Sequence, residues 1–504
     1  MSHLGSFDLA VVGGGVNGAG IARDAAGRGL SVLLIEKDDL AQGTSSRSSK
    51  LVHGGLRYLE QYAFRLVRES LAEREILLRT APHLVRPMRF VLPQEGGQRP
   101  GWLVRLGLLI YDHMGSRKIL PASRALDLAR APEGFGLRRE FRRGFAYSDC
   151  AVDDARLVVA NALDARRLGA RIETRTALVG SRRDGGAWRL TLKRESGEMT
   201  VEARALVNAA GPWTAEALSA ANAKSEKRLR LVKGSHLVTR KFWQGEQAYL
   251  LQNPDRRVVF VTPYEGDFAL IGTTDVPFAG RPEDAAIAPE ETDYLLAAVR
   301  RYFAEAPAPA DILDCFSGVR ALLDDGASEA SAVTRDYDFE LDAPVAAAPL
   351  LSVFGGKLTT YRRLAEQALA RLSRAFPAMG PAWTKSAILP GGALDAPDFA
   401  AFLAAVARRW PWLPSSLAEG YARRYGARIA ELIDGATSMA DLGRHFGDGL
   451  YEREARFVTA NEWAESAEDI LERRTKHHLR LSAEERRSFE AWLAAVAGGR
   501  EPRR

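Results

Sequence analysis

The sequence predicts an α/β fold in three parts: a domain on a parallel sheet, a second domain on an antiparallel sheet, and a C-terminal all-helical domain. Three observations predict these parts. Residues 7–36 follow a strand, glycine turn, helix, strand pattern, and residues 258–272 read as a hairpin. After residue 392 the composition becomes rich in Ala, Arg, Glu and Leu. At about 150 residues per domain, the 504 residues are enough for three such parts.

The N-terminal pattern is a complete βαβ unit with a glycine fingerprint. Gly13 permits the tight turn, Gly15 lets the backbone approach a pyrophosphate, and Gly18 allows close packing of helix on strand. Glu36 ends the second strand, where a carboxylate accepts hydrogen bonds from an adenosine ribose. That carboxylate disfavours a 2′-phosphate and therefore NADP. The unit predicts a Rossmann-type dinucleotide site.

Further strands and helices are expected along the chain. Apolar residues at helical spacing predict a helix over 64–79, which stops before Pro82. The apolar runs 205–211 and 350–355 resemble buried parallel strands, and each ends in glycine before a plausible helix. Both could deliver backbone amides to the same side of one sheet. The hairpin between them indicates that the two domains are interleaved.

We expect six segments with boundaries set by these patterns. The dinucleotide domain takes residues 1–80, 146–230 and 346–388, the substrate domain takes 81–145 and 231–345, and the helical domain takes 389–504. Capping boxes at Ser466–Asp469 and Ser482–Glu485 support helices in the last segment.

Composition and charge narrow the function. Hydrophobic residues make up 46% and charged residues 27%, as in ordinary globular proteins. The net charge of +6 should attract an anion: nucleic acid, acidic lipid or a phosphorylated metabolite. Basic clusters such as 473–476 lack the interleaved aromatics of a nucleic-acid module, so no nucleic-acid partner is expected.

Cysteine usage and hydropathy exclude other classes. Cys150 and Cys315 have no CxxC spacing and no companion histidine, so we expect no metal site, two small buried residues and a reducing compartment. No run of about 18 apolar residues occurs, so no membrane-spanning helix is expected. Residues 7–12 read as a strand and not as a signal peptide.

The fingerprint does not distinguish FAD from NAD. A flavin needs backbone contacts from distant parts of the chain along its ribityl and isoalloxazine portions. The segments 44–50, 208–211 and 355–359 supply small residues, hydroxyls and amides at three such places. FAD is therefore favoured.

Longer motifs carry a resemblance to a known family. They are the segments 45–59, 147–156, 233–236, 271–275, 317–320 and 354–362. In this order they resemble the bacterial FAD-dependent, membrane-associated glycerol-3-phosphate dehydrogenases, over essentially the whole chain. Three positions depart from the family pattern: Arg47 where a small residue is expected, Ala210 where Thr is usual, and Ala321 where Pro is usual. They affect loop geometry and remove no charged group.

The resemblance implies a reaction and a location. The reaction is oxidation of sn-glycerol 3-phosphate to dihydroxyacetone phosphate, with electrons passing to a membrane quinone. The location is the cytoplasm, peripheral on the inner face of the cytoplasmic membrane. A homodimer is compatible with the sequence, which does not determine the oligomeric state.

The fingerprint and the resemblance together predict the site residues. FAD contacts are expected at Gly13, Gly14, Gly15, Asn17, Gly18, Glu36, Thr44, Ser45, Ser48, Lys50, Leu51, His53, Gly211, Gly356, Leu358 and Thr359. Substrate contacts are expected at Arg57, Tyr58, Thr273, Asp275, Arg320, Arg335 and Lys357. The catalytic group is expected to comprise His236, Arg320 and Lys357.

Each expected role has a chemical reason. Arginines bind a phosphate dianion through bidentate, charge-assisted bonds, although any single arginine could instead form a surface ion pair. Imidazole accepts the C2 hydroxyl proton near neutral pH while the hydride goes to flavin N5, which makes His236 the candidate base. His236 could alternatively be structural, and His53 is expected to pack at the flavin. Lys357 and Thr359 could stabilise the anionic reduced ring.

A surface segment and two rival functions complete the prediction. Residues 99–118 combine Trp102, Leu103, Leu106, Leu108, Leu109, Ile110 and Tyr111 with Arg99, Arg105, Arg117 and Lys118. This pattern suits an element at a membrane interface or an amphipathic core helix. The rivals are an oxidase that passes electrons to oxygen and a non-catalytic flavin-fold scaffold.

Overall fold

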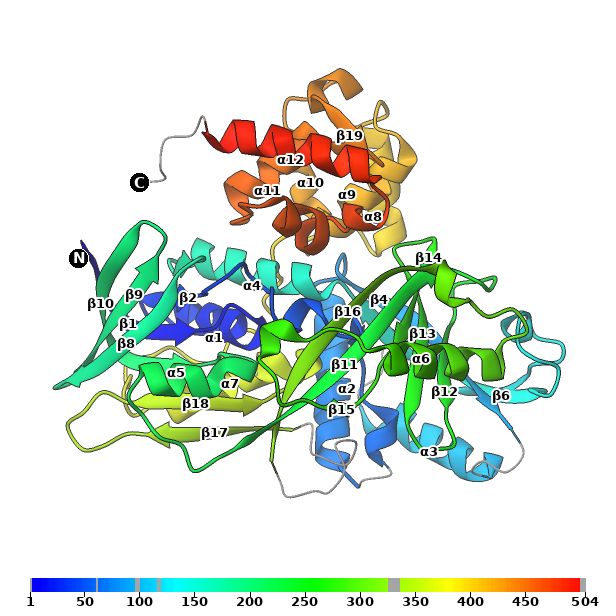
Figure 1. The fold of residues 1–504 in the computed structure, drawn as a ribbon, viewed down its shortest axis with the longest axis horizontal. Helices are drawn as coiled ribbons and strands as arrows, with labels where there is room; N and C mark the ends of the chain where they lie inside the picture. Colours follow the sequence, from blue (N-terminus) through cyan, green and yellow to red (C-terminus); the bar gives the residue numbers. More distant parts are fainter. Residues whose placement is uncertain (1, 60–61, 96–99, 116–118, 325–335, 499–504) are drawn as a thin grey trace.

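The computed structural model describes residues 2–59, 62–95, 100–115, 119–324 and 336–498. It contains two large sheets side by side, with a helical unit above them (Figure 1). The predicted α/β class, with two interleaved domains and a helical C-terminal region, is confirmed.

The first sheet has the strand order of a nucleotide-binding domain. Its main path is β17 (Tyr337–Asp342), β18 (Leu350–Gly355), β10 (Gly197–Asn208), β1 (Ser2–Val12), β2 (Val32–Ile35) and β7 (Arg171–Glu173), with β8 (Ala177–Asp184) and β9 (Ala187–Arg194) paired beside β10. From β18 to β7 the strands are parallel. The glycines that follow β1, β10 and β18 therefore meet at one edge of the sheet, as predicted.

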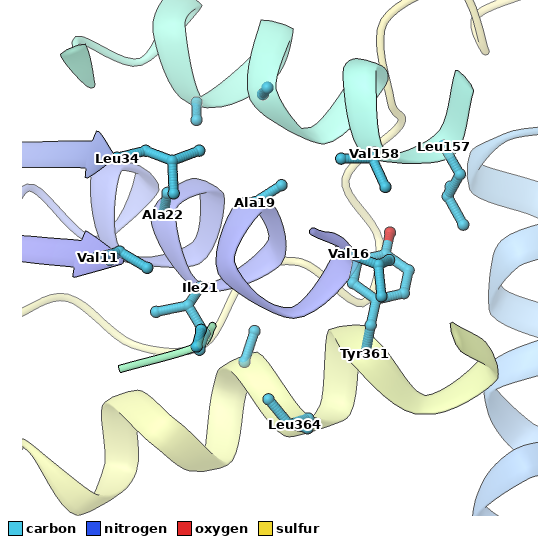
Figure 2. Close-up of a cluster of buried hydrophobic side chains, with 14 of the residues drawn as sticks. Val11, Val16, Ala19, Ile21, Ala22, Leu34, Leu157, Val158, Tyr361 and Leu364 are labelled. Carbon is cyan, nitrogen blue, oxygen red and sulfur yellow. The ribbon is translucent and has the colours of Figure 1, made fainter. Parts of the chain in front are cut away.

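Helix α1 (Val16–Gly27) lies between two other helices, α4 (Asp154–Arg167) and α7 (Tyr361–Arg371) (Figure 2). Val11 and Leu34 bring the sheet into the same buried cluster. A Cβ on Gly20 would lie 2.7 Å from a ring carbon of Tyr361, so only glycine allows this approach. The Tyr361 hydroxyl accepts a hydrogen bond from Asn161 Nδ2 at 3.0 Å. This packing fixes the N-terminus of α1 relative to the sheet.

The second sheet is mainly antiparallel. Its main path is β15 (Val276–Pro277), β11 (Leu229–Arg240), β14 (Phe268–Gly272), β13 (Val258–Tyr264), β12 (Ala248–Gln252), β4 (Val85–Gln94), β6 (Arg143–Val152) and β3 (Leu51–Val52), with β16 (Ile312–Leu323) beside β11 and β5 (Arg124–Asp127) beside β6. The predicted hairpin is β13 with β14. Helices α2 (Phe64–Thr80), α3 (Gly101–Met114), α5 (Thr214–Ala220) and α6 (Pro289–Tyr302) complete the two domains.

The sheets correct two of the predicted boundaries and the assignment of one strand. β6 pairs with β4 as far as Val152, so the substrate domain continues beyond residue 145. β17 pairs with β18 in the first sheet, so the third dinucleotide segment begins near residue 337 instead of 346. β3 lies within the first segment but pairs with β6. The pairings of β6 with β4 and with β3 join segments far apart in the chain, which leaves no local signal in the sequence. β17 and β18 are neighbours in the chain, and the sequence analysis did not recognise their hairpin.

The C-terminal region is helical apart from one short hairpin. Its helices are α8 (Phe399–Arg409), α9 (Ser415–Tyr425), α10 (Ile429–Leu432), α11 (Glu452–Asn461) and α12 (Ala483–Gly498). β19 (His445–Gly447) and β20 (Leu450–Tyr451) form the hairpin, because Asp448 and Gly449 both adopt positive φ at the turn. The prediction of an all-helical domain is corrected to this extent. Both capping boxes are confirmed by reciprocal hydrogen bonds.

Buried ion pairs hold the helical region on the dinucleotide domain. Both Arg473 and Arg474 donate to the carboxylate of Asp39, at 2.7–2.8 Å. Lys476 donates to Asp153 at 2.7 Å. The basic cluster 473–476 is therefore internal and is no anion-binding surface.

The two cysteines differ in environment. Cys150 is fully buried on β6, as expected, and burial raises the pKa of its thiol. Cys315 is exposed, which corrects the prediction. Its strand β16 is bordered only by β11 among the described strands, so one side of it faces solvent.

Candidate active site

A cavity of about 440 Å³ lies between the two sheets. It is lined by all three glycine turns of the first sheet and by strands β11, β12, β13 and β16 of the second. One end is thus formed by the dinucleotide domain and the other by the substrate domain. We call them the dinucleotide end and the substrate end.

The dinucleotide end is shaped by the backbone. Gly13 has a φ of +111°, and a Cβ there would lie 2.5 Å from the Ala209 carbonyl oxygen. Glu36 accepts hydrogen bonds from the backbone N–H groups of Gly14 at 2.6 Å and Asp38 at 2.8 Å. Burial raises the pKa of the Glu36 carboxyl despite these bonds. The geometry matches the predicted turn and places the carboxyl beside it.

The same end has the features that a bound dinucleotide requires. The N-terminus of α1 faces the cavity, where its partial positive charge attracts a pyrophosphate. Asn17 donates to the Gly355 carbonyl, while its own Oδ1 is buried with no donor among the described residues. Gly356, at a φ of +106°, keeps the space beside Asn17 open. A cofactor with a diphosphate fits this arrangement.

Most of the predicted FAD contacts line the cavity. They are Gly13, Gly15, Asn17, Glu36, Thr44, Ser45, Ser48, Leu51, His53, Gly211, Gly356, Leu358 and Thr359. Gly14, Gly18 and Lys50 do not. Gly18 packs directly on the Gly13 carbonyl. Lys50 is 8% exposed and its ammonium group binds Asp154 at 2.9 Å and the Ser46 carbonyl at 2.8 Å, so its role is to hold the loop.

At the substrate end, Arg320 is held in place by two neighbours. Its guanidinium donates to Asp275 at 2.5 Å and to the Thr273 hydroxyl at 2.9 Å. A Cβ on Gly234 would lie 2.4 Å from Arg320 Nη2, so this glycine makes room for the guanidinium. The pairing of β11 with β16 sets both positions. Asp275 and Thr273 thus fix the orientation of the Arg320 guanidinium.

Two further cations line the cavity. Arg57 forms no ion pair with a carboxylate of the described residues, and Lys357 Nζ lies 3.8 Å from the centroid of the Tyr58 ring. Arg335, the third predicted arginine, lies outside the described residues. The structure therefore brings Arg57, Tyr58, Arg320 and Lys357 together around one space.

The two histidines differ in their access to the cavity. His53 lines it, and burial together with the nearby cations Lys357 and Arg74 lowers the pKa of this imidazole to about 3. His236 is 1% exposed and does not line it. Its Nε2 lies 2.9 Å from the hydroxyl of Ser49, which does line the cavity. His236, the predicted base, thus reaches the cavity only through Ser49.

Sequence reasoning missed the apolar wall of the substrate end. Leu250, Val258 and Phe260 line it, and the Phe260 ring packs edge-on against His53 with centroids 6.1 Å apart. The alternation of Val258 and Phe260 placed them on one face of the hairpin. It could not indicate which face meets the cavity.

The unusual residue Arg47 also lines the cavity. It donates to the Ser317 carbonyl at 3.4 Å. A Cβ on Gly318 would lie 2.7 Å from the Arg47 carbonyl oxygen, so the two loops touch at this point. Ala210 and Ala321, the other departures from the family pattern, line the cavity as well.

Helix α3 exposes its apolar side chains. Trp102 is 70% exposed, and Leu103, Leu106, Leu109 and Ile110 are exposed too, while Leu108 and Tyr111 are buried. The alternative of a core helix is therefore wrong for most of its apolar residues. Arg99, Arg117 and Lys118 lie outside the described residues. Within the parts of the chain that the structure describes, no helix is long and apolar enough to span a bilayer.

Comparisons with known proteins find a matching family model and similar proteins over most of the chain. The family model described as FAD dependent oxidoreductase matches residues 8–361. D-erythritol 1-phosphate dehydrogenase of Brucella abortus is 56% identical over 98% of this chain and 99% of that protein. Glycerol-3-phosphate dehydrogenase of Pseudomonas aeruginosa is 55% identical over 94% and 93%.

A solved structure agrees with them. The X-ray structure of the glycerol-3-phosphate dehydrogenase from Bacillus halodurans complexed with FAD is 27% identical, with a TM-score of 0.78. It covers 98% of this chain and 92% of that chain.

Proposed function

The chain belongs to the FAD-dependent oxidoreductases, and on that premise we propose that it oxidises sn-glycerol 3-phosphate to dihydroxyacetone phosphate. One observation carries the proposal: a single cavity joins a dinucleotide cradle to a group of cations. The glycine turns and the N-terminus of α1 would hold FAD, which would supply a hydride acceptor. A small phosphorylated alcohol fits the other end, because its phosphate meets the cations while its carbon chain points along the cavity.

We assign the phosphate to Arg57, Arg320 and Lys357. A hydrogen bond to a charged group contributes about 1.5–3 kcal/mol net, so two or three of them hold a small substrate firmly. Arg320 is oriented by Asp275 and Thr273 before any ligand binds. Its guanidinium therefore loses little conformational freedom on binding.

The base must take the C2 hydroxyl proton as the hydride leaves. We favour His53, because it lines the cavity whereas His236 does not. Burial lowers the pKa of both imidazoles, so each is neutral near pH 7 and the pKa does not choose between them. His236 is the second candidate. In that route the Ser49 hydroxyl accepts the substrate proton and passes its own to His236 Nε2, over the 2.9 Å contact.

D-erythritol 1-phosphate is the second candidate substrate. The Brucella relative named for it is as similar to this chain as the glycerol-3-phosphate dehydrogenase is. Both compounds carry a phosphate and a secondary hydroxyl, and they differ by one carbon unit. The cations assigned to the phosphate suit both compounds. The length of the cavity beyond these cations therefore decides between the two substrates.

Anaerobic mixing of the purified yellow protein with each compound tests the proposal. We expect loss of the oxidised flavin absorbance with glycerol 3-phosphate, at a higher rate per unit concentration than with erythritol 1-phosphate. The reverse order would assign the longer substrate. No bleaching with either compound would contradict the proposal and favour a flavin-fold scaffold.

We further propose that electrons leave to a membrane quinone, with α3 as the contact to the cytoplasmic membrane surface. The exposed apolar side chains of α3 suit burial among lipid chains, and the net charge of +6 suits anionic lipid. Turnover with a ubiquinone analogue should exceed turnover with oxygen, whereas stoichiometric peroxide without quinone would indicate an oxidase.

A vesicle assay tests the surface separately. Leu106→Glu should weaken co-sedimentation with anionic phospholipid vesicles about tenfold, because a charge replaces an apolar contact. Val345→Glu is the matched control, since Val345 is 98% exposed away from α3. Equal binding of the two variants would remove α3 from the contact.

A further inference from the structure

A buried hydrogen-bond chain connects helix α3 to the loop that carries His53. Tyr111 of α3 is 2% exposed. Its hydroxyl accepts a hydrogen bond from the backbone N–H of Gly54 at 2.8 Å and donates to Asp149 at 2.7 Å. Gly54 lies between two residues that line the cavity, His53 and Gly55. The chain therefore ends on the active-site backbone.

The far end of this chain is anchored. Arg74 donates to Asp149 at 2.7 Å and to the Ser148 carbonyl at 3.0 Å. Burial raises the pKa of Tyr111 well above its usual value, so its hydroxyl keeps the proton that it donates to Asp149. The Tyr111 oxygen is then left as the acceptor for Gly54. The direction of every hydrogen bond in the chain is determined.

The loop has little room to move away from Tyr111. A Cβ on Gly54 would lie 2.6 Å from the Tyr111 hydroxyl oxygen and 2.5 Å from a methyl group of Leu71. Gly55 then turns the chain with a φ of +79° and leads into Arg57. Holding the Gly54 amide in place therefore sets the direction of the backbone on both sides, toward His53 and toward Arg57.

Packing alone does not account for this arrangement. A buried ion pair such as Arg74 with Asp149 is often no more stable than apolar residues of the same volume. It does fix geometry, because each charged group must keep its partner. The cavity wall shares the contact, since the ring of Tyr147 meets that of Tyr111 edge-on with centroids 6.0 Å apart.

We propose that Tyr111 is a positioning residue, which holds the segment 53–57 in the geometry that oxidation requires. It does not line the cavity and acts through the Gly54 amide. The proposal rests on the roles given above to His53 and Arg57. Displacement of a reacting group by about 1 Å can cost on the order of 100-fold in rate, so a small shift of this loop is sufficient.

The test compares Tyr111→Phe with Tyr249→Phe in the FAD-loaded protein. Tyr249 is also buried, and its hydroxyl likewise accepts one hydrogen bond, from Gln247, and donates one, to the Glu133 carbonyl. Each variant thus loses one accepted hydrogen bond and one donated proton, which in Tyr111 is shared between the two Asp149 oxygens. Only Tyr111→Phe removes the shorter of the two hydrogen bonds that the Gly54 amide donates, and it leaves the longer one to Asp149 Oδ1 at 3.4 Å.

Two measurements are made on each variant. Hydrogen exchange by mass spectrometry of peptides within residues 51–59 should become at least tenfold faster in Tyr111→Phe and stay unchanged in Tyr249→Phe. The rate of flavin reduction at saturating substrate should fall about 10- to 100-fold in Tyr111→Phe, with FAD content unchanged. Tyr249→Phe should reduce at the wild-type rate.

The outcomes separate this proposal from the proposed function. Exchange and reduction that match the Tyr249→Phe control would overturn the positioning role. Loss of FAD from Tyr111→Phe would also overturn it, because the tyrosine would then support the whole fold. If no polyol phosphate bleaches the wild type, the proposed function fails, and the exchange measurement alone still decides whether Tyr111 holds the loop.

Discussion

The two ends of the cavity are built in different ways. At the dinucleotide end the contacts come mainly from the backbone of the glycine turns that follow β1, β10 and β18, and they depend on φ angles and on the N-terminus of α1. At the substrate end they come from side chains of segments separated by up to about 300 residues, from Arg57 to Lys357. The dinucleotide end therefore depends on backbone conformation, whereas the substrate end depends on the charges of its side chains.

A backbone site fails when a side chain is added, because no other rotamer relieves the clash. A side-chain site fails by degrees, because each hydrogen bond contributes its own share. Substitutions at the dinucleotide end should therefore have large effects on FAD binding, and substitutions at the substrate end should have smaller effects on the reaction with substrate.

Gly13→Ala should abolish FAD binding. The added methyl group would lie 2.5 Å from the Ala209 carbonyl oxygen, at a φ that disfavours any side chain. The flavin absorbance of the purified variant should be less than about 1% of the wild-type value, because the dinucleotide turn no longer forms. Gly186→Ala is the control, since its Cβ would meet nothing within 4 Å. A yellow Gly13→Ala protein would show that the turn is more tolerant than the geometry implies.

His53→Gln should slow flavin reduction by about 10²- to 10⁴-fold while FAD stays bound, because general base catalysis contributes that much. His236→Gln should have a smaller effect, since His236 reaches the cavity only through Ser49. Stopped-flow measurement of both variants at saturating substrate checks the order. If His236→Gln is the slower variant, the relay through Ser49 is the main route for the proton.

Arg320→Ala should raise the substrate concentration at half-maximal rate about 10- to 150-fold, the equivalent of 1.5–3 kcal/mol. The effect on FAD content should be absent, because the loss lies at the substrate end. Arg182→Ala, at an exposed position on β8, is the control. An unchanged substrate dependence would remove Arg320 from the phosphate contacts.

The pH dependence of flavin reduction should show the smallest change. With a pKa of about 3, His53 stays neutral from pH 8 down to about pH 4, so the rate at saturating substrate should be flat between pH 5.5 and 8. A histidine at the ordinary value of about 6.5 would lose about tenfold by pH 5.5. Such a loss would indicate that His53, which burial and Lys357 keep neutral, is not the base.

Local patterns in the sequence were sufficient for much of the fold. The βαβ unit, the helix over 64–79, the hairpin of β13 and β14 and both capping boxes involve partners within about 30 residues, so their signals are contiguous. The boundary near residue 346 was misplaced because the hairpin of β17 and β18 was not recognised, although its strands are neighbours in the chain. The boundary near residue 145 was misplaced because it depends on the long-range pairing of β6 with β4. The exposure of Cys315 depends on the same kind of long-range arrangement.

The sequence by itself predicted the dinucleotide turn, because glycine spacing is a local property. The preference for FAD came from three distant segments, and the cations of the substrate end came from the resemblance to a known family. Only the tertiary structure decided which of these residues meet. It turned Lys50 toward Asp154, set His236 behind Ser49, brought His53 to the cavity and joined Tyr111 to Gly54. The reason is physical: the direction of a side chain is set by packing and strand pairing across hundreds of residues, and no local pattern records it.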